Sequence, residues 1–238
     1  VFDVLSYPNL FHNLKAAIKD ACSGKDNQNL NIYYEDTQIS PKEMLEIIKN
    51  KEFSRFPENM SGAAREAYET LLHTGDGQLC DVIIDRAALD AIYAAGEAAK
   101  DSIIKEYAES VVAIADIKIA VRSQKTAKTI EFMKRAMAPC KSINVEQLSK
   151  AAAAGMEAVA EYLSGTAYAE GGQAIAESSS AFERWCDNRM MQAMQPQKYE
   201  SFSVGPLVAY VLARENEIKT VRIILSGKQN GFSEEPIR

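Results

Sequence analysis

Two acidic residues, Asp81 and Asp85, are the side chains of this sequence whose type and spacing most suggest chemistry. They lie four positions apart in a stretch with helical periodicity, so both carboxylates face the same side of one helix. Paired carboxylates can bind Mg²⁺ or share a proton. The adjacent Arg86 could neutralise an acid, and Asp187 recurs 102 residues after Asp85 in a similar segment. Both features favour a structural or surface role for the pair. A helical metal-dependent enzyme using Asp81 and Asp85 therefore remains an alternative hypothesis.

The other reactive side chains are scattered. His12 and His73 fall in different predicted helices and have neither the HxxE nor the HExxH spacing of a metal site. The four cysteines show no CxxC spacing, which is typical of buried, reduced thiols in a cytosolic protein. These cysteines are Cys22, Cys80, Cys140 and Cys186. We predict no catalytic, cofactor-binding or metal-binding residue.

Two patterns near the end of the chain have simple structural interpretations. Glu215 and Lys219 have the order and spacing of a surface ion pair on a helix. The segment 226–231 superficially resembles a phosphate-binding loop, but it follows a helix and lacks both the first Gly and the GKS or GKT ending. Helix termination is the favoured interpretation of this segment.

The composition is that of a folded soluble protein and excludes some partners. Of 238 residues, 47% are hydrophobic and 25% are charged. The net charge of −6 argues against nucleic acid, because phosphate binding needs a basic face. No apolar run approaches the roughly 20 residues of a membrane span. We expect neither a nucleic-acid partner nor a membrane span.

The apolar residues recur at helical spacing along most of the chain, and strand signals are nearly absent. An all-α fold is therefore predicted. The predicted helices are 2–22, 40–50, 60–73, 78–95, 101–123, 127–137, 145–154, 156–163, 181–193 and 206–227. Residues 25–39 are expected to form a loop with room for a short strand at 32–34. Gly96 is expected to end a helix, and 165–172 to be a flexible glycine-containing stretch.

The last predicted helix has an apolar stripe, which includes Val208, Ile218 and Leu225, interrupted by a polar turn at 214–217. Similar segments begin at Asn13, Asp116 and Glu217, at spacings of 103 and 101 residues. Asp85 and Asp187 are 102 residues apart, and Glu43 and Glu146 are 103 apart. These near-equal offsets predict a duplicated helical unit of about 100 residues.

This repeat predicts the domain organisation. Residues 1–75 would be the remainder of a first repeat and the start of the second, 76–175 the second repeat, and 176–238 the third. Only twelve residues precede Asn13, and the chain begins with Val1. We therefore expect the full-length protein to carry a further N-terminal stretch.

The residues 217–228, preceded by 205–210, closely resemble the signature of the C-type subunits of the archaeal and bacterial V-type (A-type) ATPases. That family is homologous to the d-type subunits of eukaryotic V-ATPases. The segments 12–15 and 85–86 are similar to its other signature positions, so the resemblance covers essentially the whole chain. One departure is Asp116, where the middle copy often has Asn.

The resemblance implies three similar helical bundles around a pseudo-threefold axis, forming a funnel. It implies a non-catalytic component of the central stalk, without a cofactor, at the cytoplasmic face of the membrane. Its partners would be the central axle subunits D and F and the membrane-embedded proteolipid ring. The protein would couple ATP synthesis or hydrolysis to proton or sodium transport. A free-standing helical adaptor without a motor remains a further alternative.

Within this arrangement, we expect the polar positions Asn13, Asp116 and Glu217 to fix the packing of helices inside the three bundles. Replacing Glu217 with Leu is then expected to disturb folding before it disturbs coupling, because a buried polar contact would be lost.

Overall fold

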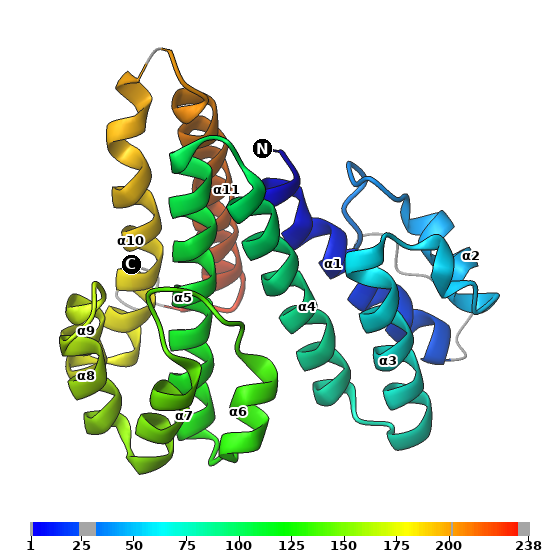
Figure 1. Cartoon of the computed structure of the whole chain (residues 1–238), viewed down its shortest axis with the longest axis horizontal. Helices are drawn as coiled ribbons and strands as arrows, with labels where there is room; N and C mark the ends of the chain where they lie inside the picture. Colours follow the sequence, from blue (N-terminus) through cyan, green and yellow to red (C-terminus); the bar gives the residue numbers. More distant parts are fainter. Residues whose placement is uncertain (1, 24–31, 201, 233–238) are drawn as a thin grey trace. The chain divides into compact units, whose positions relative to one another are not determined.

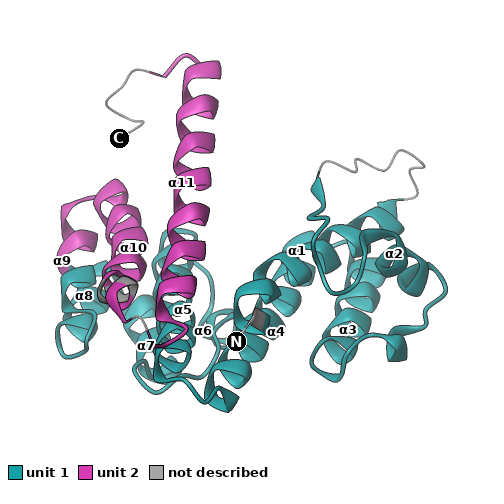
Figure 2. Ribbon diagram, turned by 90° about the horizontal axis from the view of Figure 1, so that it is seen from above, with its two compact units in different colours: residues 1–172 teal, residues 173–238 magenta. Residues whose placement is uncertain are grey.

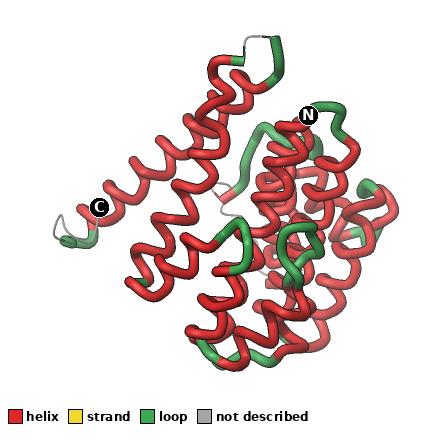
Figure 3. The backbone as a smooth tube through the Cα atoms, turned by 60° about the vertical axis from the view of Figure 1, so that its left-hand side comes forward, coloured by secondary structure: helices red, strands yellow, loops and turns green. Residues whose placement is uncertain are grey.

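The computed structural model describes residues 2–23, 32–200 and 202–232, and this part of the chain contains helices and loops but no strand (Figures 1 and 3). The predicted all-α fold class is confirmed. The α-helices are α1 (Phe2–Ser23), α2 (Pro41–Lys49), α3 (Glu58–Thr74), α4 (Gly77–Ala98), α5 (Ser102–Lys125), α6 (Ile130–Ala136), α7 (Val145–Ala154), α8 (Met156–Ser164), α9 (Ala169–Glu177), α10 (Ser179–Met194) and α11 (Gly205–Gln229). Two short 3₁₀ helices are η2 (Phe53–Arg55) and η3 (Gln195–Tyr199).

The chain divides into two compact units, Val1–Gly172 and Gln173–Arg238 (Figure 2). The predicted loop at 25–39 falls partly outside the described residues. Its described part, 32–39, contains no strand.

The first half of unit 1 is a helical layer with a single apolar core. Helix α1 packs against α2, α3 and α4 (Figure 1). Burying large apolar side chains is the main stabilising contribution to such a layer. The largest fully buried side chains here are Phe11, Leu14, Ile18, Met44, Ile47, Ile48, Met60 and Ile84.

The second half of unit 1 is built around α5, which contacts α4, α6, α7 and α8. Helix α4 therefore lies between α1 and α5 and connects both halves of the unit (Figure 1). Val112 and Ile117 of α5 are fully buried, as are Met133 and Leu148 from the helices that cover it. A long helix with buried residues on most of its circumference is typical of a central element of a helical domain.

The prediction that Gly96 ends a helix is wrong, because α4 continues to Ala98. A Cβ atom at position 96 would lie 2.2 Å from the Cβ of Ala108 in α5. The glycine therefore permits two helices to approach closely, which is a tertiary requirement that local sequence signals do not reveal.

The prediction of a flexible stretch at 165–172 is also wrong, since α9 begins at Ala169. A Cβ atom on Gly172 would lie 2.8 Å from the carbonyl oxygen of Ala160 in α8. This glycine too serves close backbone packing.

Other local signals gave correct helix boundaries. The hydroxyl oxygen of Ser40 accepts a hydrogen bond from the backbone N–H of Glu43 at 3.3 Å, and Pro41 occupies the first position of α2, as is typical of a helix N-terminus. Gly75 ends α3 with a φ of 68°, a left-handed conformation that glycine adopts without steric cost.

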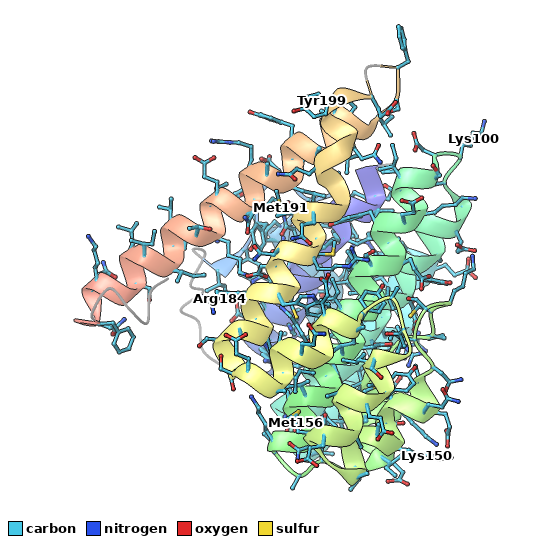
Figure 4. All side chains as sticks on the ribbon, turned by 90° about the vertical axis from the view of Figure 1, so that its left-hand side faces the viewer. Lys100, Lys150, Met156, Arg184, Met191 and Tyr199 are labelled. Carbon is cyan, nitrogen blue, oxygen red and sulfur yellow. The ribbon has the colours of Figure 1, made fainter. Side chains whose placement is uncertain are left out.

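Unit 2 consists mainly of α10, η3 and α11. Arg184 and Met191 lie along α10 (Figure 4). Val208 and Leu212 in the first half of α11 are buried. The helix passes the predicted stop at Gly227 and ends at Gln229, where the backbone N–H of Asn230 donates to the carbonyl of Ser226.

Candidate functional site

The acidic pair Asp81 and Asp85 lies on the face of α4 that meets α1. Lys19 Nζ is 2.6 Å from Asp81 Oδ1, and Lys15 Nζ is 2.7 Å from Asp85 Oδ1. Two lysines four positions apart on one helix therefore match two acids four positions apart on the next. The ammonium groups occupy the positions that a bound cation would need, so this geometry favours helix pairing over metal chemistry.

The described residues contain no group of three or more His, Cys, Asp or Glu side chains that could hold a metal ion. In the same part of the chain, no helix has both the length and the apolar character needed to cross a membrane.

Asn13 is the first of the three repeated polar positions, and it is fully buried in α1. Its Oδ1 accepts the backbone N–H of Tyr34 at 2.9 Å. Its Nδ2 donates to the carbonyl oxygen of Tyr34 at 2.8 Å and to the hydroxyl of Thr37 at 3.1 Å. The amide thus pairs with both backbone groups of one residue and fixes the connection that follows α1.

Asp116 is the second repeated position, and it is equally buried in α5. Its Oδ1 accepts the backbone N–H of Ala138 at 2.9 Å, whereas Oδ2 has no hydrogen-bond partner among the described residues. Burial raises the pKa of this carboxyl to about 8, although the Ala138 N–H and the charge of Arg86 act in the opposite direction. The carboxyl is therefore mainly protonated at neutral pH.

Arg86 of the neighbouring helix α4 binds the same segment of chain as Asp116, the residues that follow α6. Its guanidinium donates to the backbone carbonyl of Met137 and to Asp90 Oδ2, the latter at 2.8 Å. Asp116 and Arg86 thus hold adjacent residues of the segment after α6, Ala138 and Met137. In both copies a buried polar side chain on a long helix binds a backbone N–H that lies 21 or 22 positions further along the chain.

Glu217 differs from the first two positions. Its side chain is 59% exposed and pairs with Arg214 in its own helix. The expectation that Glu217 fixes helix packing is therefore wrong for the described unit. Tyr34 and Ala138 lie 21 and 22 positions after Asn13 and Asp116. The same step from Glu217 falls outside the described residues.

Lys219 forms an ion pair with a partner that the sequence did not predict. Its Nζ lies 2.7 and 2.6 Å from the two carboxylate oxygens of Asp187 in α10. The predicted pair between Glu215 and Lys219 is therefore wrong. Asp85 and Asp187, which the repeat aligns, both pair with a lysine of a long helix, but Asp85 follows its lysine by 70 positions and Asp187 precedes its lysine by 32.

The second half of α11 exposes apolar side chains. Ile218, Val221 and Leu225 occupy one face and are 48%, 48% and 57% exposed. The segment 218–229 contains three basic residues and no acidic one. We call Ile218, Val221 and Leu225 the α11 face. Three apolar side chains of this helix are therefore about half exposed to solvent.

The described structure is thus an all-helical scaffold in which buried polar side chains of two long helices bind backbone groups, and the second half of α11 exposes apolar side chains. The model of the ATP synthase (C/AC39) subunit family matches residues 1–238. The chain belongs to this family, and the resemblance drawn from residues 205–228 is confirmed.

A relative from Enterococcus hirae, the C-type subunit of its V-type sodium ATPase, is 25% identical over 232 residues. This similarity covers 96% of the present chain and 70% of the relative. No solved structure matches the chain.

Proposed function

We propose that this chain is a non-catalytic component of the central stalk of a V/A-type rotary ATPase. It would act as a socket that seats the axle subunits D and F and rests on the proteolipid ring, at the cytoplasmic face of the membrane. The observation that carries the proposal is the family match over the whole chain. The similarity to a component of a V-type sodium ATPase supports it.

The packing of unit 1 suits a part that transmits torque. Such a part must keep its shape under load, and satisfied buried polar contacts specify one arrangement of a core. The three hydrogen bonds of Asn13 do this for α1. Asp116 of α5 and Arg86 of α4 bind Ala138 and Met137 and so join these two helices to the segment after α6.

We further propose that the chain consists of related bundles at 1–75, 76–175 and 176–238, arranged around a pseudo-threefold axis as a funnel. Asn13 and Asp116 each accept a backbone N–H, those of Tyr34 and Ala138, 21 and 22 positions further along the chain, which supports a shared plan. The α11 face would then be covered in the assembled motor, because exposed apolar area favours association.

The test is reconstitution of full-length protein with the purified D–F pair and with the detergent-solubilised ring, followed by size-exclusion chromatography with light scattering. We expect a complex with each component. Folded protein that elutes apart from both would refute the proposal and restore the adaptor hypothesis.

A matched pair of variants sharpens this test. Val221→Asp alters the α11 face, whereas Ile223→Asp alters a residue of the same helix that is equally exposed, at 48%, but lies on the opposite side. We expect Val221→Asp to weaken association by about tenfold or more at an unchanged melting temperature. Ile223→Asp should bind as the wild type does. Equal behaviour of both variants would exclude the α11 face from the contact.

A further inference from the structure

A pocket of about 370 Å³ lies on unit 1, between α3 and the turn that joins α2 to η2. Its floor is aromatic, because Phe53 is buried and its ring centroid lies 5.6 Å from that of Tyr68. Leu72, one helical turn beyond Tyr68, is 54% exposed at the edge of this floor. The pocket therefore offers apolar surface to an incoming side chain.

Basic side chains surround the floor. The guanidinium carbon of Arg65 is 6.0 Å from the centroid of the Phe53 ring, and Lys51 and His73 line the same pocket. No carboxylate of the described residues forms an ion pair with Lys51, Arg65 or His73, although Glu69 also lines the pocket. A guanidinium above an aromatic ring is positioned to form a bidentate pair with a carboxylate.

The neighbouring Arg55, which does not line the pocket, is by contrast fully paired. Arg55 contacts three carboxylates, those of Glu43, Glu46 and Glu52, at 2.9 to 3.5 Å. Lys51 and Arg65 of the pocket have no such carboxylate partners within the described residues, so their positive charge is available to a ligand.

Lys51 also has a strained backbone. Its φ is 59°, and it follows the end of α2 with its N–H bonded to the carbonyl of Ile48 at 3.1 Å. Glycine is the usual residue at this left-handed position after a helix, and a lysine there is unfavourable. A lysine at this strained position is therefore a reason to test the role of its side chain in the pocket.

We infer that this pocket binds an acidic segment of a partner protein. An apolar side chain of the segment would contact Phe53, Tyr68 and Leu72, while its carboxylates pair with Lys51 and Arg65. The exposed Leu72 favours a protein segment over a phosphate group or nucleic acid, because only the segment supplies a matching apolar side chain. The overall charge of −6 also disfavours nucleic acid. This inference does not depend on the proposed motor role.

The test is selection of peptides from a random displayed library against the full-length protein, followed by NMR mapping of the selected sequences. We expect enrichment of Asp and Glu beside Leu, Phe or Trp, with shifts at Arg65, Tyr68 and Leu72. Affinity should fall as salt rises, because exposed charges are screened. Selected peptides that lack acidic residues, or that map elsewhere, would overturn the inference. An oligothymidylate that shifts the same residues as strongly would also overturn it.

Two matched variants test the role of the lysine, each by placing glycine at a residue with a left-handed backbone. Lys51→Gly removes the cation and relieves the left-handed conformation, so the melting temperature should stay equal or rise while peptide affinity falls at least fivefold. Ala127→Gly relieves the same kind of strain at φ 49°, away from the pocket, and should bind as the wild type does. Undiminished binding by Lys51→Gly would contradict the inference.

Discussion

Replacing Asp116 with Asn should stabilise the protein at neutral pH and remove a large part of its pH dependence. The asparagine keeps the acceptor for the Ala138 N–H, which the carboxyl now binds at 2.9 Å. Its NH₂ group takes the place of Oδ2, which has no partner among the described residues. The variant therefore resembles the protonated acid in shape and hydrogen bonding but never titrates. Asn13, its counterpart in α1, already is an amide.

The magnitude follows from the pKa of Asp116, which burial raises from 3.8 to about 8. Between these values the unfolded chain has lost the proton and the folded chain still holds it, so the free energy of unfolding falls as pH rises. The loss is about 1.4 kcal/mol per pH unit. The contribution is fully present below pH 3.8 and has fallen by about 4 kcal/mol at pH 7.

The assay is urea denaturation of wild type and Asp116→Asn at pH 4, 5, 6 and 7. The stability difference between them should be under about 1 kcal/mol at pH 4 and grow to about 4 kcal/mol in favour of the variant at pH 7. Titration of other groups cancels in this difference, since both proteins share them. A difference that does not change with pH, or a variant less stable at pH 7, would refute the assignment of a buried, protonated carboxyl.

Three other predictions use the same fold. Asn13→Asp should cost about 2 to 4 kcal/mol at pH 7 and less at pH 4.5, because the ionised carboxylate cannot donate to the carbonyl it now contacts; equal urea midpoints would contradict this. Gly96→Ala should lose about 1 to 3 kcal/mol by overpacking, whereas Gly62→Ala, which has open space around it, should be neutral or stabilising by calorimetry. Magnesium at millimolar concentration should leave the melting temperature unchanged, because lysines already pair with Asp81 and Asp85; a reproducible rise would show a metal site.

Local signals in the sequence were sufficient for most helices. The cap by Ser40 at the start of α2 and the helical spacing of the apolar residues in α5 act within one or two turns, so their consequences can be predicted without the fold. Gly96 and Gly172 were misjudged, because a glycine that permits close helix packing looks the same in sequence as one that ends a helix.

The candidate site was harder to predict, because it depends on contacts between residues that are far apart in the sequence. The repeat aligned Asp85 with Asp187, but their lysine partners lie 70 and 32 positions away on other helices. Glu217 aligned with Asn13 in sequence, yet its environment differs, since no described connection covers it. The pocket at Lys51 was missed because its signal is a backbone angle. A lysine just after a helix, where glycine is usual, was the available clue.

The most direct test of the proposed motor role is ATP-driven ion transport by vesicles that contain the complete ATPase of the source organism, with and without this protein in its full-length form. We predict that removing the protein abolishes transport while ATP hydrolysis by the catalytic head continues, and that adding it back restores transport. Transport that persists without the protein, or hydrolysis that is lost with it, would contradict a non-catalytic coupling role.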